Sequence, residues 1–113
     1  MQATGWARNE PTWSPEEKKL ARKAFEQAYN RQCAALLAKI KEMIASSADP
    51  NVIWQVHDYL SEQRKEVDRT FDYRYSVLQQ VFGKLLCEGW LTEADLAGLG
   101  EDKLKKIKLW ATL

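Results

Sequence analysis

The side chains most able to do chemistry gather in one segment, residues 53–76, which includes the only histidine of the chain. At about 100° per residue, a helix places four of them within an arc of roughly 120°: Trp54, His57, Asp58 and Arg64. An imidazole, a carboxylate and a guanidinium on one face can form ion pairs and charge-assisted hydrogen bonds with a partner. A solvated helix flank usually carries Lys, Glu and Gln, so the indole is unexpected there. We predict that this face is a recognition surface.

A neighbouring arc of the same helix is apolar, and it carries Ile53, Val56, Leu60, Val67 and Phe71. Such a stripe at helical spacing predicts a packing seam. Two simpler interpretations of the polar face stay open beside recognition. The tryptophan alone could belong to a core or a dimer seam, and the polar groups could be an ordinary solvated flank with weak intrahelical pairs.

An enzyme is the least favoured interpretation of the His57–Asp58 pair. Adjacent helical residues point about 100° apart, so we expect the carboxylate to be poorly placed to orient the imidazole. Metal-dependent phosphohydrolases also contain a His-Asp pair, but they need several histidines. No nucleophile, phosphate-binding loop or set of metal ligands accompanies the pair. We therefore predict no bond chemistry, no metal and no cofactor.

The composition is that of one folded domain of 113 residues, with 45% apolar and 29% charged residues. A net charge of +1 argues against a dedicated binder of nucleic acid or of anionic membranes. No apolar run approaches the roughly 20 residues of a membrane span, and the start lacks the apolar core of a secretory signal, so we expect a cytosolic protein. In that compartment, Cys33 and Cys87 are expected to be two buried thiols rather than a disulfide.

The chain is predicted to be helical almost throughout, with no alternating strand pattern. A polar, mobile tail is expected at 1–12 and a long helix at about 15–46, opened by the capping box Ser14-Pro15-Glu16-Glu17. A second helical pattern should begin with Asp49 as cap and Pro50 in the first turn. It runs towards Gly89, with an interruption near 72–74, where Arg74 would otherwise point into the apolar stripe. A short helix follows from Thr92 to Gly98 or Gly100, and a last one covers 101–110.

These lengths predict an elongated assembly. A helix of about 31 residues is roughly 46 Å long, whereas a compact domain of this size has a radius of gyration of about 13 Å. Two long antiparallel helices, at about 15–72, would form a stalk, and residues 73–113 a small helical head. Each stalk helix has a wider apolar face than one neighbour can cover. We therefore expect an all-α homodimer with twofold symmetry.

The central run I-W-x-x-H-D-Y-L-x-x-x-R-x-E-V-D, followed by F-D-Y-R-Y-S-V-L and L-L-x-E-G-W-L, resembles the cyanobacterial fluorescence recovery protein family from about Trp13 to Trp110. The resemblance implies a helical dimer that binds the orange carotenoid protein, mainly through that receptor's C-terminal domain, and speeds its return from the red to the orange form. This restores phycobilisome fluorescence. It also implies a cytoplasmic location, with peripheral association at the cytoplasmic face of the thylakoid membrane or at the phycobilisome.

The resemblance carries the partner-binding role to Trp54, His57, Asp58 and Arg64. Asp58 and Arg64 would make charge contacts with the partner. Trp54 would belong partly to the dimer interface, and His57 would hold the geometry by hydrogen bonding.

Secondary partner contacts are expected in the head, at Gln80, Phe82 and Lys106. The family tends to have bulky apolar residues where this chain has Gln79-Gln80, which keeps open an alternative: a related dimeric helical adaptor with a different protein partner. The basic residues of the last helix are expected to form a solvated face, at Lys103, Lys105, Lys106 and Lys108. Trp6 lies outside the resemblance.

Overall fold

The computed structural model describes residues 12–113, and in this range the fold is all-helical. Its helices are α1 (Pro15–Ala45), α2 (Val52–Thr70), α3 (Leu78–Cys87) and α4 (Glu101–Ala111), with a short 3₁₀ helix, η2 (Glu93–Leu96), before α4. No β-strand occurs among these residues, so the predicted all-α class is confirmed. The predicted tail, apart from Thr12, and Trp6 lie outside the described residues.

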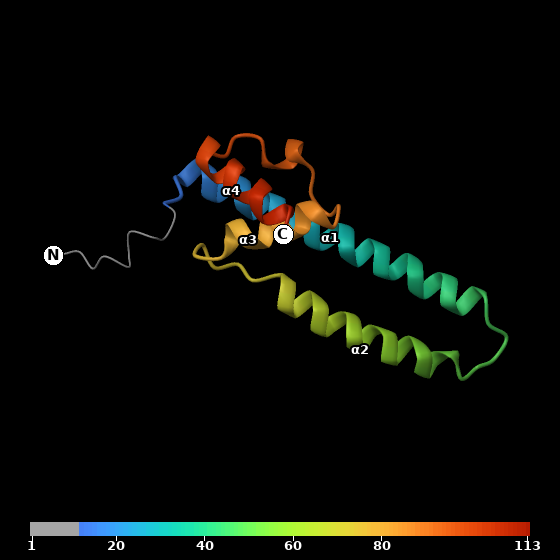
Figure 1. The fold of residues 1–113 in the computed structure, drawn as a ribbon. Helices are drawn as coiled ribbons and strands as arrows, with labels where there is room; N and C mark the ends of the chain where they lie inside the picture. Colours follow the sequence, from blue (N-terminus) through green and yellow to red (C-terminus); the bar gives the residue numbers. More distant parts are fainter. Residues whose placement is uncertain (1–11) are drawn as a thin grey trace.

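The molecule is elongated, with a radius of gyration of 17.9 Å and extents of 65 × 29 × 26 Å. In Figure 1, α1 and α2 form an antiparallel hairpin, in which α2 runs beside the second half of α1. The C-terminal helices α3, η2 and α4 gather around the first half of α1. None of the helices within residues 12–113 is both long and apolar enough to span a bilayer.

The start of α1 matches the sequence prediction, whereas the start of α2 does not. The Ser14 hydroxyl accepts a hydrogen bond from the Glu17 backbone N–H, and the Glu17 carboxylate accepts one from the Ser14 N–H. The second helix was expected to use Asp49 as its cap, but it begins at Val52 with Asn51 in the cap position. The Asp49 carboxylate instead accepts from the backbone and side-chain N–H groups of Asn51, which forms a turn before the helix.

The predicted interruption near residues 72–74 is confirmed, and aromatic packing explains it. After α2 ends at Thr70, the rings of Phe71 and Tyr73 pack edge-on against Phe25 of α1, with ring centres 5.3 and 4.8 Å away. Arg74 lies outside on the surface and forms an ion pair with Asp72 at 2.6 Å. The two hairpin helices are therefore unequal, with 31 residues in α1 and 19 in α2.

The core lies between the first half of α1 and the C-terminal helices. α1 contributes only alanines at its buried positions, Ala21, Ala24 and Ala28, so larger side chains can approach its backbone. The largest fully buried side chains are Phe82, Leu78, Leu85, Leu91, Leu96 and Ile107. Between residues 29 and 66, Val52 alone is buried. The outer half of the hairpin therefore has almost no core of its own.

Two carboxylates fasten the C-terminal helices to α1. Asp95 of η2 accepts hydrogen bonds from the Arg31 guanidinium at 2.7 and 3.2 Å and from the Thr92 backbone N–H at 2.8 Å. The Arg31 guanidinium holds the pKa of Asp95 well below its usual range. At the start of α1, Glu17 accepts from the Gly100 N–H at 2.9 Å and from Lys103 at 3.1 Å. The expectation that Lys103 is solvated is wrong, because its side chain is only 13% exposed and paired.

Acid should weaken the attachment at Glu17. The backbone N–H groups of Ser14 and Gly100, together with Lys103, lower the pKa of Glu17 from its ordinary 4.5 to about 2. Because the folded pKa lies below the unfolded one, this stabilisation is fully present above about pH 4.5 and is lost as the pH falls towards 2. We expect the melting temperature of Glu17→Gln, followed by circular dichroism, to fall less steeply below about pH 5 than that of the wild type. Glu16→Gln is the matched control. Equal pH dependence in both variants would contradict the assignment.

Gly83 allows α3 and α4 to pack closely. A Cβ atom at this position would lie 2.4 Å from the Trp110 Cβ and 2.9 Å from the Ile107 carbonyl oxygen. Since both neighbours belong to α4, Gly83→Ala should force the helices apart and lower the free energy of unfolding by about 1–3 kcal/mol, although alanine favours helix. Urea denaturation measures this loss. Lys105→Ala, on the exposed face of α4, should change the same free energy by less than about 0.5 kcal/mol.

Candidate partner-binding site

The four predicted site residues all lie on the surface of α2. This helix contains neither Gly nor Pro, and it places Trp54 in its first turn and Arg64 three turns later. Trp54 is 63% exposed, and the side chains of His57, Asp58 and Arg64 are also exposed. Within this chain none of them is a core residue. They form one accessible surface, which we call the α2 patch.

The polar members of the α2 patch are paired within the helix. His57 Nδ1 lies 3.2 Å from Asp58 Oδ1, so this carboxylate reaches the imidazole, although we expected it to be poorly placed to orient that ring. Rotation about the two side chains compensates for the angle between neighbouring positions. Arg64 Nε donates to Asp68 at 3.2 Å and not to Asp58. Exposed pairs of this kind contribute little to stability, so a partner can exchange them for its own charges.

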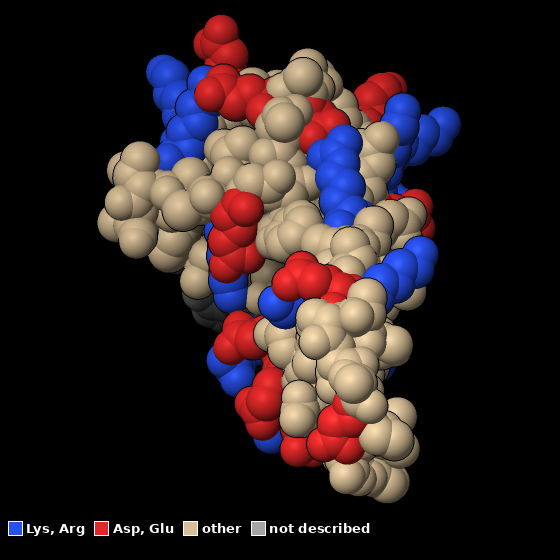
Figure 2. All heavy atoms as spheres, turned by 90° about the vertical axis from the view of Figure 1, so that its right-hand side faces the viewer, with Lys and Arg blue, Asp and Glu red and all other residues tan. Residues whose placement is uncertain are grey.

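Uncovered apolar side chains accompany the α2 patch. On α2, Ile53 and Leu60 are 57% and 41% exposed, although the sequence predicted a packing seam there. On α1, Leu37 and Ile44 are 55% and 52% exposed. Figure 2, which views the molecule from the tip of the hairpin, shows uncharged side chains over much of this end, with acidic groups beside and among them. The predicted apolar stripe of α2 is therefore present, but no other part of residues 12–113 covers it.

Arg64 also borders a shallow groove between the two hairpin helices. The groove has a volume of about 240 Å³ and is lined on the α1 side by Tyr29, Cys33 and Leu36, and on the α2 side by Leu60, Gln63, Arg64 and Val67. Tyr29 and Cys33 were not among the residues predicted for this site. Both residues belong to the wide apolar stripe of α1. That stripe is broader than the surface that one neighbouring helix can cover, and this could have indicated that they line an open groove.

The three secondary residues differ in exposure. Gln80 and Lys106 lie on the surface of the C-terminal helices. Phe82 is fully buried in the core, so its side chain is not available to a partner in this arrangement, and the expected contact there is corrected. Its position within the apolar period of α3 turns the ring inward.

The two cysteines differ from the sequence prediction. Cys33 and Cys87 are both exposed, so the prediction of two buried thiols is wrong. Periodicity placed them on apolar faces, but those faces are not covered in this chain. Within residues 12–113, no group of three or more potential metal-ligating side chains occurs. The His57–Asp58 contact lies on an open helix surface.

Comparison with known proteins connects this site to a family. The profile of the family described as photoprotection regulator fluorescence recovery protein matches residues 13–111. The chain belongs to the fluorescence recovery protein family. It is 38% identical to the fluorescence recovery protein of Synechocystis sp. PCC 6803 over 104 residues, which covers 92% of this chain and 95% of that protein.

Solved structures of fluorescence recovery proteins share the fold. The structure from Fremyella diplosiphon superposes with a TM-score of 0.82 at 38% identity, and that from Synechocystis sp. PCC 6803 with 0.83 at 37%. Each covers 90% of this chain and 100% of the other. The family is described as one of photoprotection regulators.

Proposed function

We propose that this chain binds the light-activated orange carotenoid protein and accelerates its return from the red to the orange form, which restores phycobilisome fluorescence. One observation carries the proposal: the four side chains of the family motif lie exposed together on α2, beside apolar surface that this chain does not cover. A carboxylate, a guanidinium and an indole that are free of core packing are the groups that a protein interface uses for orientation and anchoring.

The active form that we propose is a homodimer joined along the outer half of the hairpin. Its four exposed aliphatic side chains are Leu37, Ile44, Ile53 and Leu60. A second copy related by a twofold axis would supply the apolar cover that this half lacks. The hairpin would then form the stalk of the dimer, and the C-terminal helices would form a head at each end.

The mechanism that we propose is conformational and requires no cofactor. A protein that binds one state of its partner shifts the equilibrium only by its difference in affinity for the two states. The dimer would bind the receptor when its two domains are separated, mainly through the C-terminal domain, and favour the geometry in which they close. Weak binding to the closed receptor would permit turnover. We place this activity in the cytoplasm, at the cytoplasmic face of the thylakoid membrane.

The test is the dark decay of the red receptor's absorbance, with this protein added well below one equivalent. Marked acceleration is expected, because a catalyst that releases its product acts repeatedly. Equal dissociation constants for the red and orange receptor would contradict the mechanism. No acceleration, with the dimer verified in the same buffer, would instead favour the alternative of a related adaptor with another partner, towards which Gln79-Gln80 points.

A further inference from the structure

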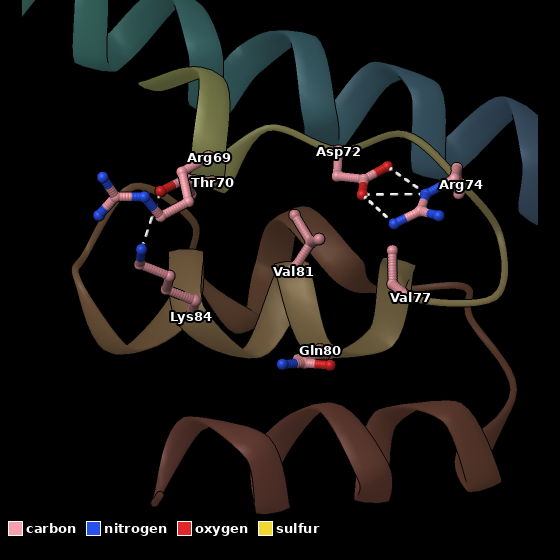
Figure 3. Close-up of a pocket in the computed structure, with 8 residues that line it drawn as sticks. All are labelled: Arg69, Thr70, Asp72, Arg74, Val77, Gln80, Val81 and Lys84. Carbon is pink, nitrogen blue, oxygen red and sulfur yellow. Dashed lines mark hydrogen bonds and ion pairs between the residues drawn. The ribbon is translucent and has the colours of Figure 1, made fainter. Parts of the chain in front are cut away.

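A pocket of about 330 Å³ lies at the elbow where the chain leaves α2 and enters α3, away from the α2 patch (Figure 3). The last turn of α2 contributes Arg69 and Thr70, the connecting segment contributes Asp72 and Arg74, and α3 contributes Lys84. Three cationic side chains and one carboxylate therefore line it. This leaves two positive charges in excess among the lining residues, and Glu66, outside the pocket, pairs with one of them, Arg69. An excess of this sign in a concave site attracts an anionic group.

Lys84 is the cation without a carboxylate. Arg69 forms an ion pair with Glu66 at 2.7 Å, and Arg74 forms one with Asp72 at 2.6 Å. Lys84 Nζ, in contrast, donates at 2.8 Å to the hydroxyl of Thr70, which is buried, and no ion pair of Lys84 occurs within residues 12–113. The carbonyl end of α2 offers it only the partial negative charge of a helix terminus. An ammonium has three N–H donors, so Lys84 can accept an anionic partner without giving up Thr70.

The remaining walls favour an anion attached to a carbon chain. Figure 3 shows Val81 and Val77 between the Lys84–Thr70 pair and the Asp72–Arg74 pair. Val77 is also the cap residue of α3, and no side chain caps this helix, so its free N–H groups add partial positive charge at the same edge. The valines can contact the methylene groups of an acidic side chain.

We propose that this elbow pocket is a docking site for an acidic side chain, a glutamate or aspartate, of a protein partner, with Lys84 as its principal anchor. The carboxylate would pair with the ammonium, and the side-chain methylenes would lie against the valines. This docking site goes beyond the function proposed above, and it can be tested in the absence of any carotenoid protein. A failure of the pocket proposal would therefore be distinguishable from a failure of the proposed function.

The test is a titration of the full, ¹⁵N-labelled chain with the capped tripeptide Ac-Ala-Glu-Ala-NH₂, followed by amide chemical shifts. We expect saturable shifts at Thr70, Gln80 and Lys84, with a dissociation constant of about 1–10 mM, because one charge-assisted contact is made. The uncharged Ac-Ala-Gln-Ala-NH₂ should produce none. Lys84→Gln, which retains a donor for Thr70, should weaken binding at least about fivefold, and the matched control Lys105→Gln should leave it unchanged.

Three results would overturn the proposal. The first is equal binding of the two peptides, and the second is the absence of any saturable shift at the pocket up to about 50 mM, which is well above the dissociation constant expected for one such contact. The third is saturation by inorganic phosphate without saturation by the glutamate peptide, which would make the pocket a site for a free anion. Amide spectra of Lys84→Gln also report its fold, so a loss of binding caused by unfolding would be visible directly.

Discussion

Asp58→Leu is expected to remove most of the acceleration of red-to-orange reversion while the fold is retained. The Asp58 side chain is 84% exposed, and within residues 12–113 its one ion pair is with His57, at 3.2 Å, so its loss should reduce the stability of the fold little. A carboxylate that contacts a partner cation across a desolvated interface contributes far more to the free energy of binding than an exposed pair contributes to folding. We therefore expect at least about a tenfold lower acceleration at equal dose, measured as the initial rate of dark decay of the red receptor's absorbance.

Glu66→Leu is the matched control for this substitution. It makes the same change from carboxylate to leucine on the same helix, but about 140° around the helix from the centre of the α2 patch, and its side chain is 51% exposed. It should retain near wild-type acceleration. Both variants should remain dimeric by light scattering and melt within a few degrees of the wild type. Equal losses in the two variants would contradict a specific role for Asp58, and full activity of Asp58→Leu would remove the α2 patch from the mechanism.

Features of the fold set by neighbouring residues could be predicted from the sequence. The capping box at Ser14 depends on residues three positions apart, and the place of Arg74 in an apolar stripe was enough to indicate an interruption after α2, although aromatic packing is what fixes it. The four residues of the α2 patch share a face because helical spacing requires it. Their common face on α2 could therefore be predicted from spacing alone, whereas the partner was suggested only by the resemblance to a family.

Features set by distant contacts or by competing acceptors could not be predicted. The attachment of Glu17 to Gly100 joins residues 83 positions apart, and nothing local singles out Lys103 from the lysines that follow it. Asp49 was a plausible helix cap, but the N–H groups of Asn51 compete for the same carboxylate. Cys33 shows the remaining difficulty. Periodicity identifies an apolar face, but only the tertiary structure shows whether anything covers it.

Leu60→Glu is expected to dissociate the proposed homodimer. Leu60 is 41% exposed and lies at the groove that Arg64 borders, within the uncovered apolar surface of the hairpin. A carboxylate at this position must either lose its hydration or separate the two copies, and burying it would cost several kcal/mol of association free energy. Twofold symmetry introduces the charge once from each copy, so the dissociation constant should rise at least about 100-fold. Sedimentation velocity over a range of concentrations measures this change.

Gln55→Glu is the matched control, because it places the same carboxylate on the same helix at an exposed position turned away from Leu60. It should leave the dissociation constant within about threefold of the wild type. The monomer of Leu60→Glu should keep its folded C-terminal helices, because their core lies on the first half of α1. Hydrogen exchange should therefore accelerate between residues 29 and 66 and remain slow at Leu78 and Phe82. An unchanged dissociation constant for the Leu60→Glu dimer would place the interface on another face. A symmetric contact through the outer hairpin would bury two unpaired carboxylates and lose affinity.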